Sequence, residues 1–343
     1  MQTIWLNGGP GESSMYGLFT EVGPCEIIQE ADGSYGTQPR VWGWDRSSNI
    51  LIVDQPTQVG LSYDECVNAS TDFNESDPDG LGYRKEPEPL PDGVPEWRFK
   101  NGSFSSGLAN STEYLIQIAA RASWHFLQGF LSVFPQYNPG IHPSSNTVKP
   151  SLINLFAESC GGTYGPIFAD FFEEQNERRK NGSIPAATLD IHLGSLGIVN
   201  GELDVLISTV AAVEFAYNNT YGIKDIDIST YENAISNVNE KMGCRDLVTQ
   251  CGQMAAVYDL AGFGNDNNTN TVCGGAINQC LVAASVIATA QRSSYNIRVK
   301  PEVQPSIACS EYLNNANVLQ SIGAPINFTL SSSAVSYSFN SSK

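Results

Sequence analysis

Ser159 is the residue of this chain whose sequence context best suits a nucleophile. It lies in the stretch A-E-S-C-G at residues 157–161, after an apolar run and before a helical pattern. A nucleophilic serine at a tight strand-to-helix turn usually has the pattern G-x-S-x-G, because small residues two before and two after it let strand and helix pass closely. Ala157 departs from glycine but is small enough for that position. The pattern predicts an exposed serine for acyl-transfer chemistry.

A glycine-rich segment at residues 7–11, N-G-G-P-G, could stabilise the charge that such chemistry creates. Attack by serine on an acyl group forms an oxyanion, which converging backbone N–H groups stabilise. The amide of Cys160 would lie at a helix N-terminus, where the helix leaves N–H groups unsatisfied. Gly8 and Gly9 could supply the second amide, since glycine lets the backbone approach a substrate closely. The Cys160 thiol is not favoured as the nucleophile, because a side chain one residue past the turn points away from the substrate.

The elements that must position these residues alternate between strands and helices. Apolar runs predict buried strands, and apolar residues at helical spacing predict helices after the second and the third strand. This alternation predicts a mostly parallel central sheet with flanking helices. The strands are expected at residues 3–6, 49–54, 152–156 and 189–199, and the helices at about 110–134 and from just after Ser159 to about Lys180.

The first of these helices has boundary signals in the sequence. Asn110 or Ser111 could cap it, Glu113 would lie in its first turn, and Pro135 follows its end. Residues 64–107, rich in Asp, Pro, Gly and Asn, are expected to form a long surface loop before it. The apolar positions of the helix recur at Leu115, Ile118, Ala119, Ala122, Phe126, Phe130 and Val133.

The chain changes character after about residue 200. Residues 201–301 have helical patterns and a turn rich in Gly and Asn at 262–275. We therefore expect a cap inserted between sheet strands at 201–301. The core would occupy residues 1–200, and residues 302–343 would return towards it.

Half of the eight cysteines lie in this cap with a symmetrical spacing. Cys244, Cys251, Cys273 and Cys280 are separated by seven, twenty-two and seven residues. Nested disulfides, Cys244–Cys280 and Cys251–Cys273, would fit this spacing. A zinc site is the alternative, although it usually needs the C-x2–4-C spacing that is absent here. We favour disulfides, which form in oxidising compartments.

The composition points to the secretory route and away from nucleic acid. With a net charge of −18 and a pI of about 4.4, the chain lacks the excess of basic residues that is typical of nucleic-acid-binding proteins. These values suit an acidic compartment. The sequence contains no run of eighteen or more apolar residues, so we expect no membrane span. No signal peptide precedes the first strand of this sequence, so we expect N-terminal cleavage and a secreted or vacuolar location. Nine N-x-[ST] sequons predict glycosylation at Asn68, Asn74, Asn101, Asn110, Asn181, Asn218, Asn267, Asn327 and Asn340.

Four motifs in order resemble those of the serine carboxypeptidases, in particular the secreted or vacuolar enzymes of filamentous fungi. They are W-L-N-G-G-P-G at 5–11, V-D-Q-P…G-L-S-Y at 53–63, E-S-C-G-G-T-Y-G-P at 158–166 and I-V-N-G at 198–201. The resemblance implies an α/β-hydrolase fold with a helical, disulfide-linked cap. It also implies an enzyme that removes C-terminal residues from peptides or proteins, with no cofactor and no metal.

The resemblance also implies roles for individual residues. Ser159 would be the nucleophile, and the amides of Gly9 and Cys160 would form the oxyanion hole. The substrate's terminal carboxylate would bind to Asn7, Gly8 and Glu158, with Glu21 sharing a proton with Glu158 and Trp5 lining the pocket. In the family the position of Glu12 is often cysteine and that of Cys160 is usually tyrosine. The bonding partners of Cys25, Cys66 and Cys309 therefore stay open.

The pair Glu158 and Glu21 makes a prediction about pH. A glutamate can bind a carboxylate only if a proton lies between them. Two close carboxyl groups raise the pKa of one of them, which then stays protonated in mildly acidic water and can donate to the substrate. The pair therefore predicts specificity for peptide C-termini and an acidic optimum.

The general base is not evident in this sequence. In α/β-hydrolases the order is Ser, then Asp, then His. After Ser159 the only histidine is His192, which follows too soon, and His125 and His142 precede the serine. No Asp or His follows Lys300. We therefore expect a chain truncated at both ends and inactive alone, whose missing Asp and His come from a separate chain or segment. The alternatives are a catalytically dead binding protein and an acyltransferase or esterase.

Overall fold

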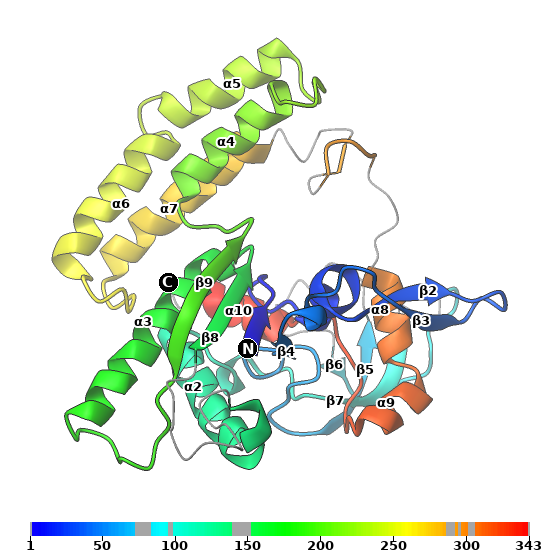
Figure 1. The fold of residues 1–343 in the computed structure, drawn as a ribbon. Helices are drawn as coiled ribbons and strands as arrows, with labels where there is room; N and C mark the ends of the chain where they lie inside the picture. The colour runs from blue at the N-terminus through cyan, green and yellow to red at the C-terminus, as the bar shows by residue number, and fades with distance from the viewer. Residues whose placement is uncertain are drawn as a thin grey trace. The chain divides into compact units, whose positions relative to one another are not determined.

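The computed structural model describes residues 2–72, 84–94, 99–138, 152–285, 292–293, 296–300 and 306–341. The chain divides into two compact units, the first formed by residues up to Gly201 together with those from Pro305 to Ser341, and the second by Glu202–Gln304. Figure 1 shows the helices and strands of both units.

The first unit is built around a parallel sheet of four strands in the order β4-β1-β8-β9 (Figure 1). All three strand pairs are parallel. The expected strands are therefore confirmed, with different ends. Strand β4 ends two residues earlier and β9 begins three residues later than predicted, and β8 runs two residues further, up to the residue before Ser159. Their bounds are β1 Gln2–Leu6, β4 Asn49–Ile52, β8 Leu152–Glu158 and β9 His192–Val199.

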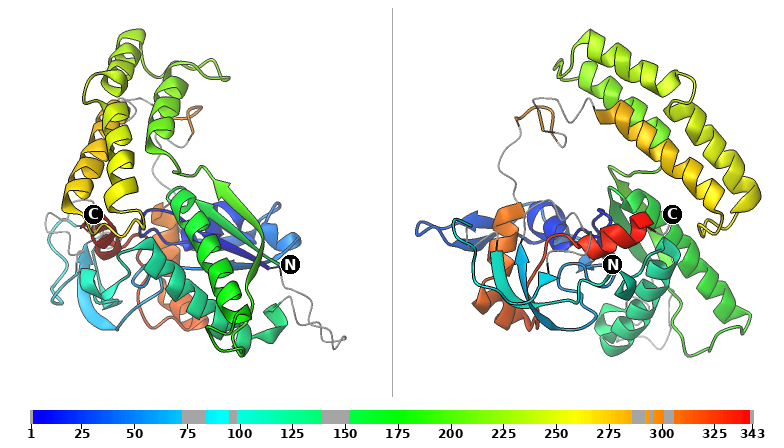
Figure 2. Two further views of the ribbon diagram at one scale, coloured as in Figure 1. Left: turned by 90° about the vertical axis from the view of Figure 1, so that its left-hand side faces the viewer. Right: turned by 180° about the vertical axis from the view of Figure 1, so that it is seen from behind.

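Side chains alternate along each strand, so apolar residues point to both faces of the sheet. Both faces are covered by other parts of the first unit. Ile4 and Ile153 are buried on the face packed against helices α2 (Ile116–Val133) and α3 (Gly161–Lys180). Figure 2 shows these helices from two further directions. Trp5, on the opposite face, meets the ring of Trp44 edge-to-face at 5.5 Å, so an aromatic cluster covers that face.

Helix α2 differs from its prediction at its start and in its buried face. It begins at Ile116, and Asn110 and Ser111 lie in a separate 3-10 turn, Ala109–Ser111. Glu113 precedes the helix. Its carboxylate accepts hydrogen bonds from the amide (2.9 Å) and the hydroxyl (3.1 Å) of Thr57, a residue distant in the sequence. The buried face contains Ala119, Ala120, Trp124, Leu127 and Leu131, whereas Phe126 and Val133 are 44% and 69% exposed.

The prediction of a surface loop at residues 64–107 is wrong. Strands β5 (Val67–Asp72), β6 (Arg84–Lys85) and β7 (Phe99–Phe104) form an antiparallel sheet in the order β6-β5-β7. Phe99 and Phe104 are buried, so two isolated aromatic residues in a polar stretch anchor this sheet.

A hairpin and short helical turns complete the N-terminal half of this unit. The hairpin strands β2 and β3 pair antiparallel (Figure 1). The bounds are β2 Cys25–Gln29, β3 Tyr35–Pro39, α1 Met15–Gly17, a π-helical turn Leu18–Val22, and 3-10 turns Trp44–Arg46 and Pro135–Tyr137.

The segment after the second unit packs back onto the N-terminal part of the chain. The Ser13 amide donates to the Leu330 carbonyl at 2.8 Å, and the Ser332 amide donates to the Gly11 carbonyl at 2.9 Å. We call residues 329–335 the return strap. Helices α8 (Ser306–Leu313) and α9 (Ala316–Ile322) precede the strap, and α10 (Ser333–Ser341) begins within it.

Three helices of the second unit, α4, α5 and α7, begin at aspartate caps. Asp204, Asp227 and Asp266 each accept a backbone N–H three residues on, at 2.8–2.9 Å, the usual way of satisfying a helix N-terminus. Helix α7 begins at Asn267, so the predicted turn at 262–275 ends before the cysteine at 273. The helices are α4 Val205–Tyr217, α5 Ile228–Asn239, α6 Cys244–Tyr258 and α7 Asn267–Ala284.

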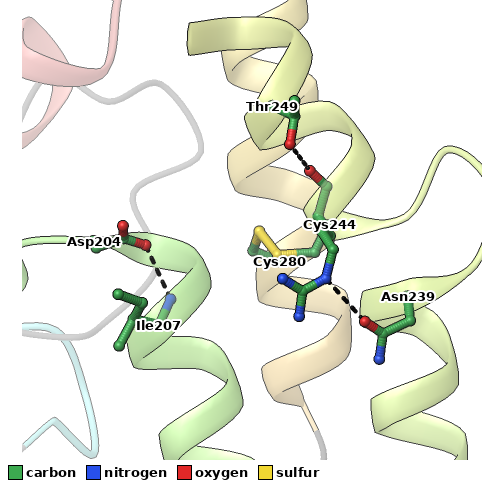
Figure 3. The surroundings of a disulfide bond; sticks show 7 residues. Asp204, Ile207, Asn239, Cys244, Thr249 and Cys280 are labelled. Atoms are coloured by element: carbon green, nitrogen blue, oxygen red, sulfur yellow. Dashed lines mark hydrogen bonds between the residues drawn. A yellow bond between two sulfur atoms is a disulfide. The ribbon is translucent and has the colours of Figure 1, made fainter.

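Two nested disulfides connect helices α6 and α7. The bonds are Cys244–Cys280 and Cys251–Cys273. Figure 3 shows the first of them, with the side chain of Asn239 accepting a hydrogen bond from Arg245 at 2.9 Å beside it. The cysteines outside these two bonds, Cys25, Cys66, Cys160 and Cys309, are thiols.

The sequons fall on different surroundings. Asn74 and the side chain of Asn340 lie outside the part of the chain that the structure describes. The Asn327 side chain is half-buried; its amide nitrogen donates to Asn314 at 3.1 Å and its amide oxygen accepts from the Ser103 amide at 3.1 Å. The exposed sequon asparagines are Asn68, Asn101, Asn110, Asn181, Asn218 and Asn267.

In the part of the chain that the structure describes, no helix combines the length and apolar character needed to cross a membrane.

Candidate active site

Ser159 lies at a sharp turn between strand β8 and helix α3. Its φ of 55° is in the left-handed region, which a residue with a side chain occupies only where its surroundings enforce it. The Ser159 amide donates to the Val199 carbonyl at 3.0 Å, and its own carbonyl accepts from the Gly162 amide at 2.8 Å. The turn therefore has the form predicted for a nucleophile.

Small residues around the turn let the strand and the helix approach each other. A Cβ at Gly161 would lie 2.7 Å from the Ala157 Cβ, and one at Gly165 would lie 3.4 Å from it. A Cβ at Gly201 would come within 3.0 Å of the Gly162 Cα. Alanine at 157 thus fits, and a larger residue there would displace α3.

The glycine loop packs directly onto the serine turn. A Cβ at Gly8 would lie 2.7 Å from the Cys160 nitrogen and 2.8 Å from the Ser159 Cβ. The Cys160 thiol donates to the Gly9 carbonyl at 3.0 Å. The structure therefore brings together the two segments that the sequence pairs, Gly8–Gly9 and Ser159–Cys160.

Asn7 is the centre of a hydrogen-bond network between the loop and the turn. Its side-chain oxygen accepts from the Trp5 indole at 2.7 Å and from the Gly17 amide at 3.3 Å. Its side-chain nitrogen donates to the Glu158 carboxylate at 2.9 Å. Its backbone amide donates to the Ser14 hydroxyl at 3.0 Å. These bonds fix the orientation of the Asn7 amide and direct it at the residue before Ser159.

Three carboxyl groups gather beside this network. Glu158 and Glu21 share a hydrogen bond between their side chains, and Glu12 lies close enough to interact with both by charge. Burial, followed by the charges of Glu21 and Glu12, raises the pKa of Glu158 to about 7. Burial and the charge of Glu12 also raise the pKa of Glu21. The pair therefore retains a proton in mildly acidic water.

Asp54 is a buried residue of this region that the sequence did not single out by role. Its carboxylate accepts from the Ser13 hydroxyl at 2.7 Å, the Ser14 amide at 2.8 Å and the Leu61 amide at 2.9 Å. Burial raises the pKa of Asp54, and these donors oppose the rise. Asp54 holds Ser14, which in turn holds Asn7. The V-D-Q-P motif was the available signal.

The register of the sheet places His192 far from Ser159. His192 pairs with Leu152, at the start of β8, whereas Ser159 follows its end. At about 3.3 Å per residue, the two residues lie at opposite ends of the sheet, roughly 20 Å apart. His192 instead lies 3.5 Å from the Glu173 carboxylate. His125 is exposed on α2, and His142 lies outside the described residues.

The family model of the serine carboxypeptidases matches residues 2–343. The chain belongs to the serine carboxypeptidase family. Its parallel sheet, flanking helices and disulfide-linked helical unit agree with the α/β-hydrolase fold that the sequence implied.

Fungal relatives share about a third of the sequence. The chain is 34% identical to carboxypeptidase S1 homolog A of Arthroderma otae over 98% of this chain and 50% of that protein. It is 33% identical to the carboxypeptidase Y homolog of Arthroderma benhamiae over 98% of this chain and 51% of that protein. The chain thus spans about half the length of these relatives.

A solved structure shares the fold. It is that of Kex1(Δ)p, a prohormone-processing carboxypeptidase from Saccharomyces cerevisiae. The TM-score is 0.57 and the sequence identity 21%, covering 100% of this chain and 60% of that one. At this identity the likeness bears on the fold alone.

Proposed function

We propose that this chain carries the nucleophile and the carboxylate-binding site of a serine-type carboxypeptidase that releases C-terminal amino acids from peptides at acidic pH. The observation that carries the proposal is the pair of half-buried carboxyl groups, Glu158 and Glu21, which share a hydrogen bond next to the nucleophile. Glu158 directly precedes Ser159 and is held at 2.9 Å by Asn7. A site of this kind recognises a free carboxylate one residue away from the bond that the serine attacks.

The reaction would proceed in two steps through an acyl-enzyme. The terminal carboxylate of the peptide accepts hydrogen bonds from Asn7, the Gly8 amide and the protonated Glu158–Glu21 pair. The Ser159 hydroxyl loses its proton to a base and attacks the last peptide carbonyl, whose oxyanion the Gly9 and Cys160 amides stabilise. The C–N bond breaks, and the C-terminal amino acid leaves with the proton. Water then hydrolyses the ester and restores the serine.

The base is expected from residues outside this sequence. His192 lies at the far end of the sheet from Ser159, as the register of β8 and β9 supports, and His125 is exposed on α2. We therefore propose that another segment or chain supplies the Asp and His. The disulfides and exposed sequons support a secreted or vacuolar location for the protein.

The test compares a blocked dipeptide with its C-terminal amide. Calorimetry at pH 5 on the full chain needs no base, and N-acetyl-Phe-Leu is expected to bind at least tenfold more tightly than N-acetyl-Phe-Leu-amide. Equal affinities would refute the proposed carboxylate site.

A fluorophosphonate labels only an activated serine, so it tests the proposed source of the base. We expect this chain to be labelled no faster than its Ser159→Ala variant, which measures the background. Rapid labelling would show that a base is already present.

A further inference from the structure

The π-helical turn Leu18–Val22 carries Glu21, whose carboxyl shares a hydrogen bond with that of Glu158. Phe19 and Val22 are buried, so these two side chains anchor one side of the turn. Short π-helical segments are uncommon and frequently occur at functional sites. The carbonyl groups at the end of a helical segment have no partner within the helix, so other groups must donate to them.

Arg40 supplies these donors from the end of the β2–β3 hairpin. Cys25, the first residue of β2, pairs with Pro39, the last residue of β3. The hairpin therefore returns the chain to the turn that precedes it. The Arg40 amide donates to the Pro24 carbonyl at 2.7 Å, and the Arg40 side chain is only 15% exposed. The position of Arg40 is thus fixed at its backbone.

The guanidinium of Arg40 donates to carbonyl groups on both sides of Glu21. Nη2 donates to the Phe19 carbonyl, Nη1 donates to the Thr20 carbonyl at 3.5 Å, and Nε donates to the Gly23 carbonyl at 3.2 Å. A planar guanidinium has its donors in fixed directions, so these bonds together fix the peptide groups before and after Glu21. The Glu21 carboxyl is therefore carried by a backbone segment that Arg40 holds at both ends.

The contacts of Arg40 with the backbone outweigh its contact with a carboxylate. Its Nη1 lies 3.7 Å from the carboxylate of Glu26, whose side chain is 42% exposed. An exposed ion pair contributes little to stability, whereas hydrogen bonds from a cation are stronger than those between neutral groups. Nη2 also donates to the Cys25 carbonyl at 3.4 Å. The main role of the guanidinium is therefore to hold the segment around Glu21.

We propose that Arg40 is a positioning residue for carboxylate binding: by holding the peptide groups on both sides of Glu21, it keeps the Glu21 carboxyl in hydrogen-bond contact with Glu158, in the arrangement that binds the terminal carboxylate of a peptide. The inference rests on the proposed function. Arg40 acts through Glu21 and not by a contact of its own with the substrate. It lies outside the four motifs that carry the family resemblance, and its role becomes visible only in the fold.

The size of the effect follows from the hydrogen bond that the carboxyl pair gives to the substrate. Without Arg40 the carbonyl groups around Glu21 lose their shared donor, and the turn can take arrangements in which Glu21 no longer meets Glu158. Losing one hydrogen bond to a charged ligand group lowers the affinity about tenfold. The affinity for a ligand without the carboxylate should change less.

The experiment measures the affinities of the full chain for N-acetyl-Phe-Leu and for its C-terminal amide by calorimetry at pH 5, and takes their ratio. Arg40→Met keeps a long side chain and removes the donors, and it should lower this ratio about tenfold. Arg40→Lys keeps a donor but lacks the planar fork, and it should lower the ratio by about threefold.

The matched control is Arg179→Met. The Arg179 guanidinium also holds a loop, by donating to the Thr188 carbonyl at 2.6 Å and to the Ala186 carbonyl at 3.0 Å. Arg179 lies in the last turn of α3, about 27 Å along the helix from its start beside Ser159. The control should therefore lose stability and keep the wild-type ratio.

A double substitution tests whether Arg40 acts through Glu21. Glu21→Ala removes one member of the carboxyl pair and should itself lower the ratio. Adding Arg40→Met to this variant should lower the ratio no further, because two changes that act through the same residue are not additive.

Each outcome separates the two proposals. If the wild type prefers the carboxylate ligand and Arg40→Met keeps that ratio while losing stability, Arg40 is merely structural, and the inference is wrong while the proposed function stands. A further loss in the Glu21→Ala background would overturn it in the same way. If the wild type does not distinguish the carboxylate from the amide, the proposed function itself fails and the inference fails with it. Should Arg40→Met not fold, Arg40→Lys decides, and an unchanged ratio there would contradict the inference.

Discussion

Replacing Glu158 by glutamine tests the central electrostatic claim about the site. Glu158→Gln puts a permanent N–H donor where the wild type has one only while the carboxyl is protonated. The Asn7 amide that donates to Glu158 at 2.9 Å can still donate to the glutamine oxygen. The substitution therefore changes the titration of the site more than its shape.

The magnitude follows from the pKa of Glu158, which burial and the charges of Glu21 and Glu12 raise to about 7. A carboxyl with a raised pKa holds its proton at low pH and loses it as the pH rises through that value. Binding that needs this proton weakens about tenfold for each pH unit above 7, by the relation between pKa and free energy. Between pH 5 and pH 8 the wild type should lose about 11-fold in affinity. The ligand carboxylate, with a pKa of about 3.5, stays charged throughout.

The assay is the affinity for N-acetyl-Phe-Leu at pH 5, 6, 7 and 8, at constant ionic strength. The glutamine variant should bind with nearly constant affinity over this range, within about threefold of the wild-type plateau. In an active enzyme that carries this site, the optimum for peptide hydrolysis should therefore move upward. A variant that loses affinity with pH as steeply as the wild type would show that Glu158 is not the titrating group, and the reasoning from the carboxyl pair would be wrong.

Two further predictions concern packing and the second unit. Gly8→Ala would place a Cβ 2.7 Å from the Cys160 nitrogen, so it should lower the free energy of unfolding by about 1–3 kcal/mol and weaken carboxylate binding. Denaturant unfolding measures the first effect and calorimetry the second. The control is Gly129→Ala in α2, where a Cβ meets nothing within 4 Å and which should cost no stability. The Cys251–Cys273 bond links residues 22 apart, and replacing both cysteines by serine should lower the free energy of unfolding of the second unit by about 3 kcal/mol. Denaturant unfolding measures this loss, with Cys66→Ser at an exposed thiol as the control. An unchanged unfolding midpoint would show that the bond does not restrict the unfolded chain.

The sequence was sufficient where local patterns and burial agree. Strands β1, β4, β8 and β9 are continuous apolar runs because both faces of the sheet are covered, and such runs are visible without a structure. The serine turn was recognisable because its small neighbours at 157 and 161 are a steric requirement of the strand–helix crossing. The same holds for Gly8, whose side-chain position is filled by the turn itself.

The sequence was insufficient where distant residues decide the outcome. Helix α2 begins after Glu113, whose carboxylate accepts hydrogen bonds from Thr57, a residue far away in the chain. The sheet β6-β5-β7 is anchored by Phe99 and Phe104, too sparse within polar residues to show a strand period. Glu12 appeared only as an unusual residue in a glycine loop, since its proximity to Glu21 and Glu158 is a product of the fold.

The return strap has a consequence for the order in which the protein is made. Its contact between Ser13 and Leu330 joins residues more than 300 positions apart, and the whole second unit lies between them in the chain. Non-local contacts of this kind form late, because the intervening chain must be ordered first. During synthesis the N-terminal residues emerge first, so the hydrogen bonds between residues 11–13 and the strap can form only after the strap has left the ribosome. A nascent chain would thus contain Ser159 and its strand before the glycine loop has all of its supports.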